Sequence, residues 1–372
     1  MAEKVLITGG AGFVGSHLAD ALLQRGYGVR VFDNLTPQVH NHRRPEYLSK
    51  DVEFVPGDMR DEEAVKRVVE GVDVVFHLAA AVGVGQSMYE IAHYMGSNTQ
   101  GTAILLQALL SRRSELRKLV VASSMSIYGE GSYHCAKCGP LAPSPREGAQ
   151  LEQKRWEIEC PHCGSTLSPA ATRESKPLQA TSIYALSKRN QEEMCLLFGR
   201  TYGLPVAALR YFNIYGTRQA LSNPYTGVAA IFASRLLNKR PPVIFEDGQQ
   251  MRDFVSVRDI VQGNLLAMTS TQGNGLAINI GSGDPISIKA IADTLSRVLD
   301  IQILPEITAR YRAGDIRHCY ADITLAKQCL GYEPKVSFEV GMAELGEWLR
   351  AQEPPDNGAR AAAQLTAFGL TM

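Results

Sequence analysis

Tyr184 and Lys188 stand four residues apart in the run Tyr-Ala-Leu-Ser-Lys, a spacing that could support acid–base chemistry. On a helix, positions i and i+4 share one face, so the ammonium of Lys188 should lie under the phenol of Tyr184. A nearby positive charge favours the phenolate, and we expect it to lower the pKa of Tyr184 from about 10 toward neutrality. Such a tyrosine is a general base for a sugar or alcohol hydroxyl, provided that a hydride acceptor lies opposite.

A glycine-rich turn near the start of the chain could hold that acceptor. Residues 4–8 are typical of a buried parallel strand, and Gly9, Gly12 and Gly15 then open a helix expected over residues 13–25. Gly9 permits a tight turn, Gly12 lets a pyrophosphate approach the backbone, and Gly15 allows close packing of helix on strand. A glycine motif alone also fits an ordinary turn, but strand, turn and helix together predict a dinucleotide-binding site.

The strand after this helix ends in an acidic residue. Asp33 follows the strand expected over residues 29–32 and lies 18 residues beyond Gly15, where a carboxylate accepts hydrogen bonds from the adenosine ribose. The same charge would repel a 2′-phosphate, so the sequence favours NAD over NADP. Arg30 could meet a phosphate, but we expect it to point into solvent.

Strand and helix patterns keep alternating through the first half of the chain. Residues 52–55, 74–80 and 119–122 are apolar runs that we expect to be parallel strands. Repeated βα units predict an α/β fold, a Rossmann-type doubly wound parallel sheet with its site at the carboxyl ends of the strands. His77 lies inside one of these runs, and we expect it to be a packed, structural histidine.

Further motifs follow in order along the chain. They are Ser-Ser-Met-Ser-Ile-Tyr-Gly at 123–129, Leu-Arg-Tyr-Phe-Asn-Ile-Tyr-Gly at 209–216, Arg-Asp-Phe-Val-Ser-Val-Arg-Asp at 252–259 and Arg-Ala-Gly-Asp at 312–315. With the glycine turn and the tyrosine–lysine pair, they make the chain resemble the extended short-chain dehydrogenase/reductase family, in particular its NAD-dependent nucleotide-sugar epimerases and dehydratases. The resemblance covers nearly the whole chain.

The resemblance implies three catalytic residues and a set of cofactor contacts. Ser124 matches the serine that hydrogen-bonds the reacting hydroxyl, Tyr184 matches the base, and Lys188 matches its partner, which also holds the nicotinamide ribose. The residues that the resemblance places at NAD are Gly9, Gly12, Phe13, Val14, Gly15, Asp33, Asn34, Asp58, Met59, Leu78, Ala79, Ala80, Asn98, Tyr184, Lys188 and Tyr211.

The resemblance also implies a site for a nucleotide sugar, whose diphosphate suits the bidentate fork of a guanidinium. The matching residues are Ser124, Ser126, Asn213, Arg252, Arg312 and Asp315. Other readings stay open, because Ser124 and Asn213 could be turn residues and Arg252 could pair with Asp253 on the surface.

Two departures from the family narrow the reaction. Dehydratases of this family carry Asp-Glu where this chain has Met125 and Ser126, and neither side chain can shuttle a proton as a carboxyl does. The glutamate expected of decarboxylating relatives is also missing. What remains is oxidation and reduction at one carbon, as in a 4-epimerase acting on a dTDP- or UDP-hexose. A 4-keto-sugar reductase that uses NAD(P)H and a non-catalytic sugar-nucleotide scaffold are the alternatives.

Two CxxC pairs lie between the matched serine and tyrosine, in a stretch longer than the family usually has. Cys135 and Cys138 form one pair and Cys160 and Cys163 the other, at a separation close to that of zinc ribbons. Four thiolates suit tetrahedral zinc, and closed coordination predicts a structural site. We expect zinc to order this segment, because so short a segment lacks a core of its own. Redox-active or idle thiols are the alternative.

By resemblance, the chain divides into three parts. Residues 1–216 would form the NAD-binding Rossmann domain, with a zinc-ribbon-like insert at 130–176 that serves as a lid or wall over the sugar or as a partner contact. Residues 217–352 would form mainly a smaller substrate-binding lobe, with segments crossing back to the large domain. Residues 353–372 would be a mobile or loosely docked tail.

A homodimer is implied by the resemblance, since relatives pair through two helices. Here these are the helix expected over 102–110 and the one that follows Tyr184. Burial inside the monomer is the competing explanation for their apolar positions, which are Leu106, Leu109, Leu110, Leu196 and Leu197.

Composition limits the other partners. Lys+Arg and Asp+Glu are equal at 38 each, so we expect no attraction to nucleic acid or to anionic membranes. No apolar run approaches the ~18 residues needed to span a bilayer. The first strand begins by Lys4 and leaves no room for a signal peptide, so we expect a cytoplasmic enzyme.

Overall fold

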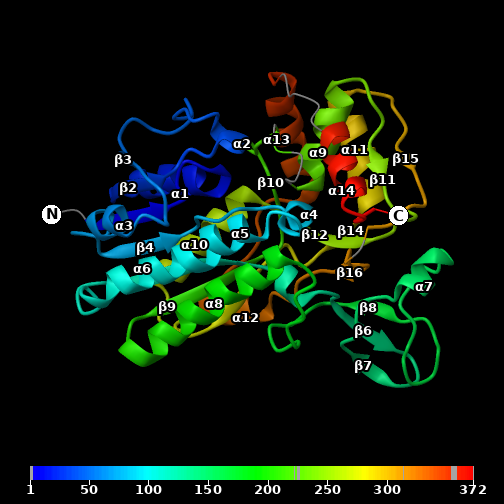
Figure 1. Cartoon of the computed structure of the whole chain (residues 1–372), viewed down its shortest axis with the longest axis horizontal. Helices are drawn as coiled ribbons and strands as arrows, with labels where there is room; N and C mark the ends of the chain where they lie inside the picture. Colours follow the sequence, from blue (N-terminus) through cyan, green and yellow to red (C-terminus); the bar gives the residue numbers. More distant parts are fainter. Residues whose placement is uncertain (1–2, 222, 224–226, 313, 353–357, 372) are drawn as a thin grey trace.

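A seven-stranded parallel sheet organises the computed structural model, which describes residues 3–221, 223, 227–312, 314–352 and 358–371 (Figure 1). The strands lie in the order β3-β2-β1-β4-β5-β9-β13. Their bounds are β1 (Lys4–Thr8), β2 (Gly28–Asp33), β3 (Glu53–Pro56), β4 (Val74–His77), β5 (Lys118–Ser124), β9 (Val206–Tyr211) and β13 (Ala277–Ile280). The strand order reverses between β1 and β4, which opens a crevice at their carboxyl ends. The prediction of a doubly wound Rossmann-type sheet is confirmed.

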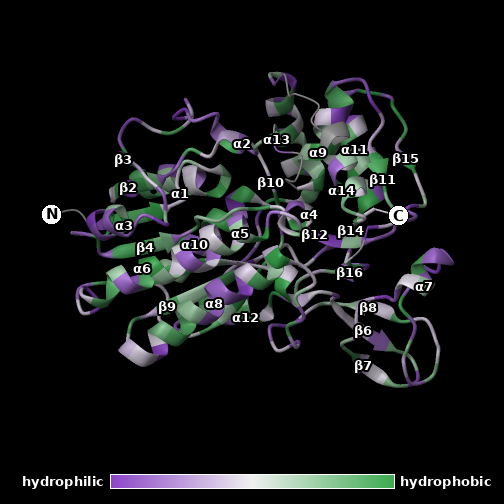
Figure 2. Ribbon diagram, in the orientation of Figure 1, coloured by the Kyte–Doolittle hydropathy of each residue, from purple (hydrophilic) through white to green (hydrophobic). Residues whose placement is uncertain are grey.

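Alternate residues of the strands face two different cores. In β1, Val5 and Ile7 belong to one buried cluster and Leu6 to the other. Helices cover both faces, so the strands carry apolar side chains on both sides of the sheet. In Figure 2 the strand β4 is coloured mainly as hydrophobic. The helices over the first face are α1 (Phe13–Leu23), α10 (Val257–Thr269) and α12 (Thr324–Leu330), and those over the second are α3 (Glu62–Val68), α6 (Gly101–Leu110) and α8 (Ile183–Tyr202).

A second, smaller lobe is built mainly from residues beyond 216 and has its own apolar cluster. Its helices are α9 (Val228–Leu237), α11 (Ile288–Leu299) and α13 (Phe338–Arg350), and its strands are β10 (Asn213–Tyr215), β11 (Val243–Ile244), β12 (Met251–Ser256), β14 (Pro285–Ser287), β15 (Glu306–Ile307) and β16 (His318–Cys319). Strand β13 and helices α10 and α12 come from the same stretch of sequence but pack in the large domain. The division into domains expected from the sequence stays a prediction.

The insert at 130–176 projects from the body of the molecule near β16 (Figure 1). It holds an antiparallel sheet and a short helix, which are β6 (Ser132–Cys135), β7 (Gly139–Leu141), β8 (Ser168–Ala170) and α7 (Gly148–Glu152). The expectation that it lacks a core was wrong. Tyr133, Ile158 and Leu167 are buried with Cys135 and Cys160 in a cluster of their own, because the hairpin strands turn these alternate side chains inward.

Short elements complete the chain around the crevice. They are α2 (Pro37–His40), α4 (Val84–Ser87), α5 (Ile91–Tyr94), the π-helix η1 (Met95–Gln100), the 3₁₀ helix η2 (Met125–Tyr128) and the tail helix α14 (Gly358–Ala367). Residues 353–357 of the expected linker lie outside the described residues. Phe368, just after α14, stacks on Tyr89 with 4.6 Å between ring centroids, so this part of the tail is docked. Within the described part of the chain, no helix has both the length and the apolar character to cross a membrane.

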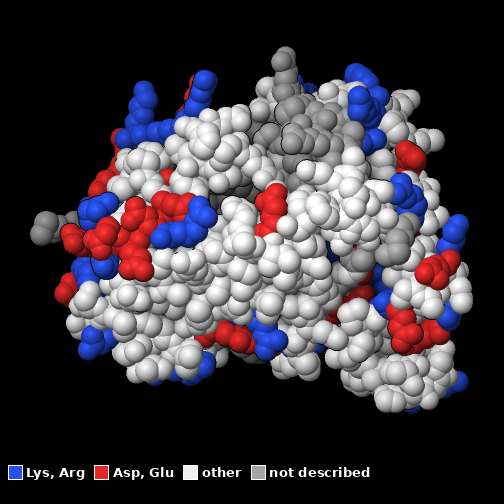
Figure 3. Space-filling view, viewed as in Figure 1, with Lys and Arg blue, Asp and Glu red and all other residues white. Residues whose placement is uncertain are grey.

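Charged side chains of both signs are mixed on the visible surface (Figure 3). They cluster around the α3 end of the molecule, where Glu63 and Lys66 form an ion pair. A broad, largely uncharged area covers α6 and α8. This mixture agrees with the equal numbers of basic and acidic residues in the sequence.

Candidate functional site

The glycine turn lies at the carboxyl end of β1, beside the point where the strand order reverses. Gly9 has a φ of +69°, which favours glycine. A Cβ on Gly15 would lie 2.5 Å from the carbonyl oxygen of Gly9, so the first turn of α1 can lie against the loop only without a side chain there. Phe13 and Val14 open α1 just after its N-cap residue, Gly12. The exposed N–H groups of this helix start could hold a pyrophosphate.

Asp33 ends β2 and braces the same turn. Its carboxylate accepts hydrogen bonds from the backbone N–H groups of Ala11 at 3.1 Å and Leu35 at 2.9 Å. Each oxygen keeps a lone pair for a ribose hydroxyl. Arg30 does not point freely into solvent as we expected, because Glu53 and the carbonyl oxygens of residues 68 and 70 hold its guanidinium. It is therefore not free to bind a 2′-phosphate.

Asn34 and Asp58 follow neighbouring strands and contact each other. Asn34 Nδ2 donates to Asp58 Oδ2 at 3.1 Å, and Arg60 pairs with the same carboxylate at 2.7 Å. The hydrogen bond from Arg60 is the largest reason why the pKa of Asp58 lies well below its usual range. Met59 is buried against Gly101 at the start of α6. These residues line the β2–β3 side of the turn.

The loop after β4 passes close to the glycine turn. The sequence led us to expect a strand through residue 80, but β4 ends at His77, and Leu78, Ala79 and Ala80 form a loop. Ala79 lies so near Gly9 that a Cβ on Gly9 would be 2.8 Å from the backbone of Ala79. Asn98 fixes this loop through two hydrogen bonds to the backbone of residue 81, at 2.7 and 3.1 Å, and a third to Ser187 of α8 at 2.9 Å.

The predicted serine and tyrosine meet at the carboxyl end of β5. Ser124 ends β5, and Tyr184 lies in the first turn of α8, which Ser182 caps by accepting the N–H of residue 185. Ser126 Oγ donates to Ser124 Oγ at 2.9 Å. Burial raises the pKa of Tyr184, and a hydrogen bond with the Ser124 side chain opposes that rise. The expectation of a pKa shifted toward neutrality was wrong for this structure.

Lys188 lies one turn below Tyr184, but its ammonium binds a different partner. Its Nζ donates to Gln191 Oε1 at 2.8 Å, and burial lowers the pKa of Lys188 to about 8. Gln191 in turn donates to Thr102 at 2.9 Å, and His77 Nε2 lies 2.8 Å from the Thr102 hydroxyl. Burial lowers the pKa of His77 to about 3, so it is a neutral, structural residue as expected.

Gln191 is a residue of this site that sequence reasoning missed. It is fully buried on α8, three residues beyond Lys188 and on the same helix face. That spacing was the one available signal, because a glutamine carries no motif of its own.

Tyr211 and Asn213 continue from the end of β9 toward the smaller lobe. Tyr211 is buried, and its hydroxyl donates to Asn264 Oδ1 at 2.8 Å. Asn213 begins β10, and its side-chain oxygen is buried without a hydrogen-bond partner among the described residues. A buried, unpaired acceptor is costly, so this oxygen is suited to receive a donor from a ligand.

The residues matched to a diphosphate site lie together in the smaller lobe. Arg312 pairs with Asp315 at 2.7 Å, and Asp315 lies 3.9 Å from Arg252. Arg252 donates to the carbonyl oxygens of Ile316 at 2.7 Å and of residue 317 at 2.9 Å. It does not pair with Asp253, whose buried carboxylate binds the backbone of residues 282, 283 and 321.

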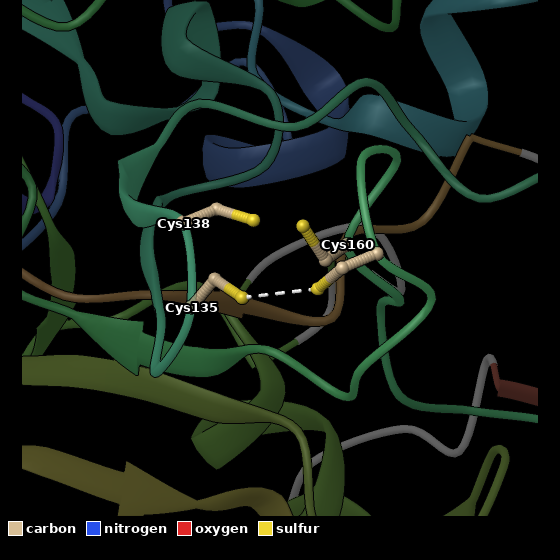
Figure 4. Close-up of side chains that lie close together, drawn as sticks. Cys135, Cys138 and Cys160 are labelled. Carbon is tan, nitrogen blue, oxygen red and sulfur yellow. Dashed lines mark hydrogen bonds between the residues drawn. The ribbon is translucent and has the colours of Figure 1, made fainter.

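The four cysteines of the insert converge at one point (Figure 4). Their sulfur atoms all lie within 4.8 Å of one another, and the sulfurs of Cys135 and Cys163 are 3.6 Å apart. A tetrahedron of thiolates around zinc has edges of about 3.8 Å for Zn–S bonds of ~2.3 Å. Cys135 and Cys160 are buried while Cys138 and Cys163 are exposed, so the set fits a structural metal site at the edge of the insert.

The fold and the site together define a class. A doubly wound sheet with a glycine turn at its switch point, and with serine, tyrosine and lysine at the end of β5 and the start of α8, is that of a short-chain dehydrogenase/reductase. The chain belongs to the NAD dependent epimerase/dehydratase family, whose model matches residues 5–147 and 162–281.

Individual relatives support the same grouping. The chain is 33% identical over 355 residues to dTDP-L-rhamnose 4-epimerase of Burkholderia thailandensis, covering 94% of this chain and 96% of that protein. It is similar to the crystal structure of Thermus thermophilus UDP-glucose 4-epimerase in complex with NAD, with a TM-score of 0.75, 30% identity, and coverage of 94% and 100%. It is also similar to Bacillus cereus UDP-glucuronic acid 4-epimerase in complex with UDP-glucuronic acid and NAD, with a TM-score of 0.76, 26% identity, and coverage of 93% and 99%.

Proposed function

We propose that this protein is an NAD-dependent nucleotide-sugar 4-epimerase that works through a transient 4-keto sugar. The main support for this proposal is the arrangement of three side chains. Tyr184 is hydrogen-bonded to Ser124 at the carboxyl end of β5, with Lys188 on the same helix face one turn below. Met125 and Ser126 stand where a dehydratase needs carboxyls, so the acid–base groups serve one carbon only.

NAD fits the residues around the glycine turn. The start of α1 would hold the pyrophosphate, and Asp33 would accept the ribose hydroxyls. The guanidinium of Arg30 is held by Glu53 and is not free to bind a 2′-phosphate, which favours NAD over NADP. When bound, NAD supplies a reversible hydride acceptor for the sugar carbon.

The protein's own part in the reaction is proton transfer and charge stabilisation. Tyr184 takes the proton of the C4 hydroxyl and later returns it to the opposite face of the sugar. Ser124 orients that hydroxyl, and the hydrogen bond between the two side chains favours the phenolate. The charge of Lys188 stabilises the developing oxyanion in a site screened from water.

The substrate would be anchored at its diphosphate. The guanidinium groups of Arg252 and Arg312 suit the phosphates. The side-chain oxygen of Asn213 is an unpaired acceptor for a donor group of the ligand. At the sugar end, Ser124 and Ser126 present only small hydroxyls. A firm anchor and a loose sugar end allow the 4-keto sugar to turn over and present its other face. A dTDP- or UDP-hexose fits this description, and the similarity to dTDP-L-rhamnose 4-epimerase favours dTDP.

We also infer that the four cysteines of the insert bind one structural zinc ion. Their geometry matches a tetrahedral thiolate set, and the two buried cysteines are part of the insert's core. Free, buried thiols elsewhere, at Cys195 and Cys319, suit the reducing cytoplasm.

A homodimer through α6 and α8 is the assembly that we propose. Leu106, Leu109 and Leu196 are buried in the monomer, so packing within one chain already accounts for their apolar side chains. Leu186 and Leu197, by contrast, are 39% and 57% exposed on one face of α8.

The test is to incubate purified protein with a panel of UDP- and dTDP-sugars and no added reductant. We expect conversion to the C4 epimer without net formation of reduced nicotinamide. Tyr184→Phe should lose turnover by a factor of about 10² to 10⁴ and keep substrate binding. In a parallel incubation with added NAD(P)H, its stoichiometric consumption would identify a reductase instead. Binding without conversion would identify a scaffold.

A further inference from the structure

A buried cluster of charges joins the insert to the smaller lobe. Every member except Glu157 and Asp247, which are partly exposed, has almost no solvent contact. The members from the insert are Glu130, Arg146 and Glu157, and those from the lobe are Glu246, Asp247, Arg317 and His318. None of these side chains belongs to the site already described.

Arg146 reaches from the insert into the lobe. Its guanidinium makes two hydrogen bonds with the carboxylate of Glu246, at 2.9 and 2.8 Å, and a third with the carbonyl oxygen of Asp315 at 3.2 Å. Its side chain is 1% exposed. A bidentate, buried arginine fixes both the direction and the distance of what it binds.

Arg317 makes the reciprocal connection. It bonds Asp247 and Glu246 of its own lobe at 2.7 and 3.0 Å, and Glu157 of the insert at 2.5 Å. The adjacent His318 lies 3.1 Å from the second oxygen of Glu157. Each side of the contact therefore carries a cation that the other side neutralises.

The backbone of the same segment is also held by the insert. Glu130 accepts the N–H of Arg317 at 2.8 Å, and the N–H of Gly131 donates to the carbonyl oxygen of His318 at 2.9 Å. At the far end of the insert, the N–H of Thr172 donates to the carbonyl oxygen of Tyr320 at 2.8 Å. Both ends of the insert are therefore hydrogen-bonded to the backbone of residues 317–320.

This segment carries or contacts the residues proposed to bind the diphosphate. Arg312 and Asp315 precede it directly, and Arg252 hydrogen-bonds the carbonyl oxygens of Ile316 and Arg317. Moving the segment by a fraction of an ångström would therefore move all three diphosphate-binding side chains together.

We propose that the insert is a clamp whose positioning residue, Arg146, sets the geometry of the diphosphate-binding side chains, so that the insert controls affinity for the nucleotide and not the chemical step. This rests on the proposed function for the identity of the ligand. Arg146 itself touches no group proposed to react.

The test measures the Kd of UDP and of dTDP by calorimetry, together with KM and kcat for the sugar that the wild-type protein converts. Arg146→Met should weaken binding of the tighter-binding nucleotide by about tenfold or more and raise KM in parallel, with kcat within about twofold of wild type. Arg146→Lys, which keeps the charge but not the bidentate geometry, should give an intermediate Kd. A general loss of structure would not produce this split between KM and kcat.

Arg155→Met is the matched control, because Arg155 pairs with Glu159 on the exposed face of the same insert. It should leave Kd unchanged. If Arg146→Met does not fold, Glu157→Gln tests the same clamp from the partly exposed side and should also raise Kd. Wild-type Kd in the folded Arg146 or Glu157 variants would overturn the inference, whereas failure of the proposed function would show as absent isomerisation by the wild-type protein.

Discussion

Tyr184 and Lys188 share a helix face, but each side chain has its own hydrogen-bond partner. Ser124 binds the phenol and Gln191 binds the ammonium. Burial raises the pKa of Tyr184 and lowers that of Lys188 to about 8, so it pushes both groups toward their uncharged forms. The hydrogen bond with Ser124 opposes this effect on Tyr184. An oxygen acceptor also favours an ammonium over a neutral amine, so we infer from its hydrogen bond that Gln191 positions the lysine charge that the proposed reaction needs.

Gln191→Met should shift the pH dependence of turnover. Lys188 is charged below its pKa of about 8, so turnover should fall as pH rises through that value. Removing the acceptor for the ammonium disfavours the charged form and lowers the lysine pKa further. The falling limb of kcat should therefore move to lower pH in the variant, as measured by a kcat–pH profile.

Asn190→Ala is the control on the adjacent position, since Asn190 binds Thr99 at 3.3 Å and not the lysine. Its profile should match that of the wild type. A Gln191→Met enzyme that is slower by the same factor at every pH would mean that the glutamine does not tune Lys188.

At the level of elements, the sequence predicted those parts whose residues follow a simple period. Strand β1 was expected and found at residues 4–8, and the start of α8 placed Tyr184 and Lys188 on one face. The run at 74–80 was read as one strand, but β4 ends at His77. The small apolar residues that follow continue the hydrophobic pattern while their backbone turns along the glycine loop.

The buried contact between the insert and the smaller lobe could not be predicted from the sequence. The insert's acidic and basic residues nearly cancel, and charged residues usually lie in solvent. Nothing in the sequence distinguishes the buried Arg146 and Arg317 from the exposed Arg155. Only the fold brings Glu130, which follows β5 in the chain, against a segment that lies 187 positions later.

The stability of the insert should also depend on the proposed zinc ion. We expect freshly purified protein to contain about one zinc ion per chain, because the four cysteine sulfurs lie within 4.8 Å of one another, which suits tetrahedral coordination. Cys163→Ser removes one ligand at an exposed position, so it should lower the zinc content with little direct damage to packing. The melting temperature should fall by several degrees, since metal binding contributes folding free energy.

Cys329→Ser is a suitable comparison, because Cys329 is a half-buried thiol outside the cluster. It should retain both the zinc and the melting temperature. Metal analysis that finds well under one zinc per wild-type chain would contradict the metal site.

For the whole molecule, the residues of the proposed site are divided between two lobes. The large sheet holds the glycine turn and the serine–tyrosine–lysine set, while the smaller lobe holds the arginines. Strand β13 and helices α10 and α12 return from the lobe's sequence to the core of the large domain, so the chain crosses between the two lobes more than once.

The proposed dimer is tested on α8. Leu197→Glu places a charge in the exposed apolar face without touching the monomer core, because Leu197 is 57% exposed. Light scattering after size-exclusion chromatography should show a wild-type dimer and a largely monomeric variant. Tyr202→Glu is the comparison, because Tyr202 is similarly exposed but lies at the end of the same helix, beyond the two leucines. This variant should disturb the dimer less. If wild type and Leu197→Glu have the same mass, this face does not join two subunits.

The fate of the hydrogen on C4 distinguishes reversible hydride transfer from any other route to the epimer. The substrate identified by the panel would be prepared with deuterium on C4 and converted by the wild-type protein in ordinary water. Because the hydride removed from C4 returns to the same carbon without meeting solvent, the epimer should keep its deuterium, as read by mass spectrometry and NMR. An epimer that carries hydrogen from the solvent at C4 would mean that the carbon had been deprotonated, and the proposed reaction would be wrong.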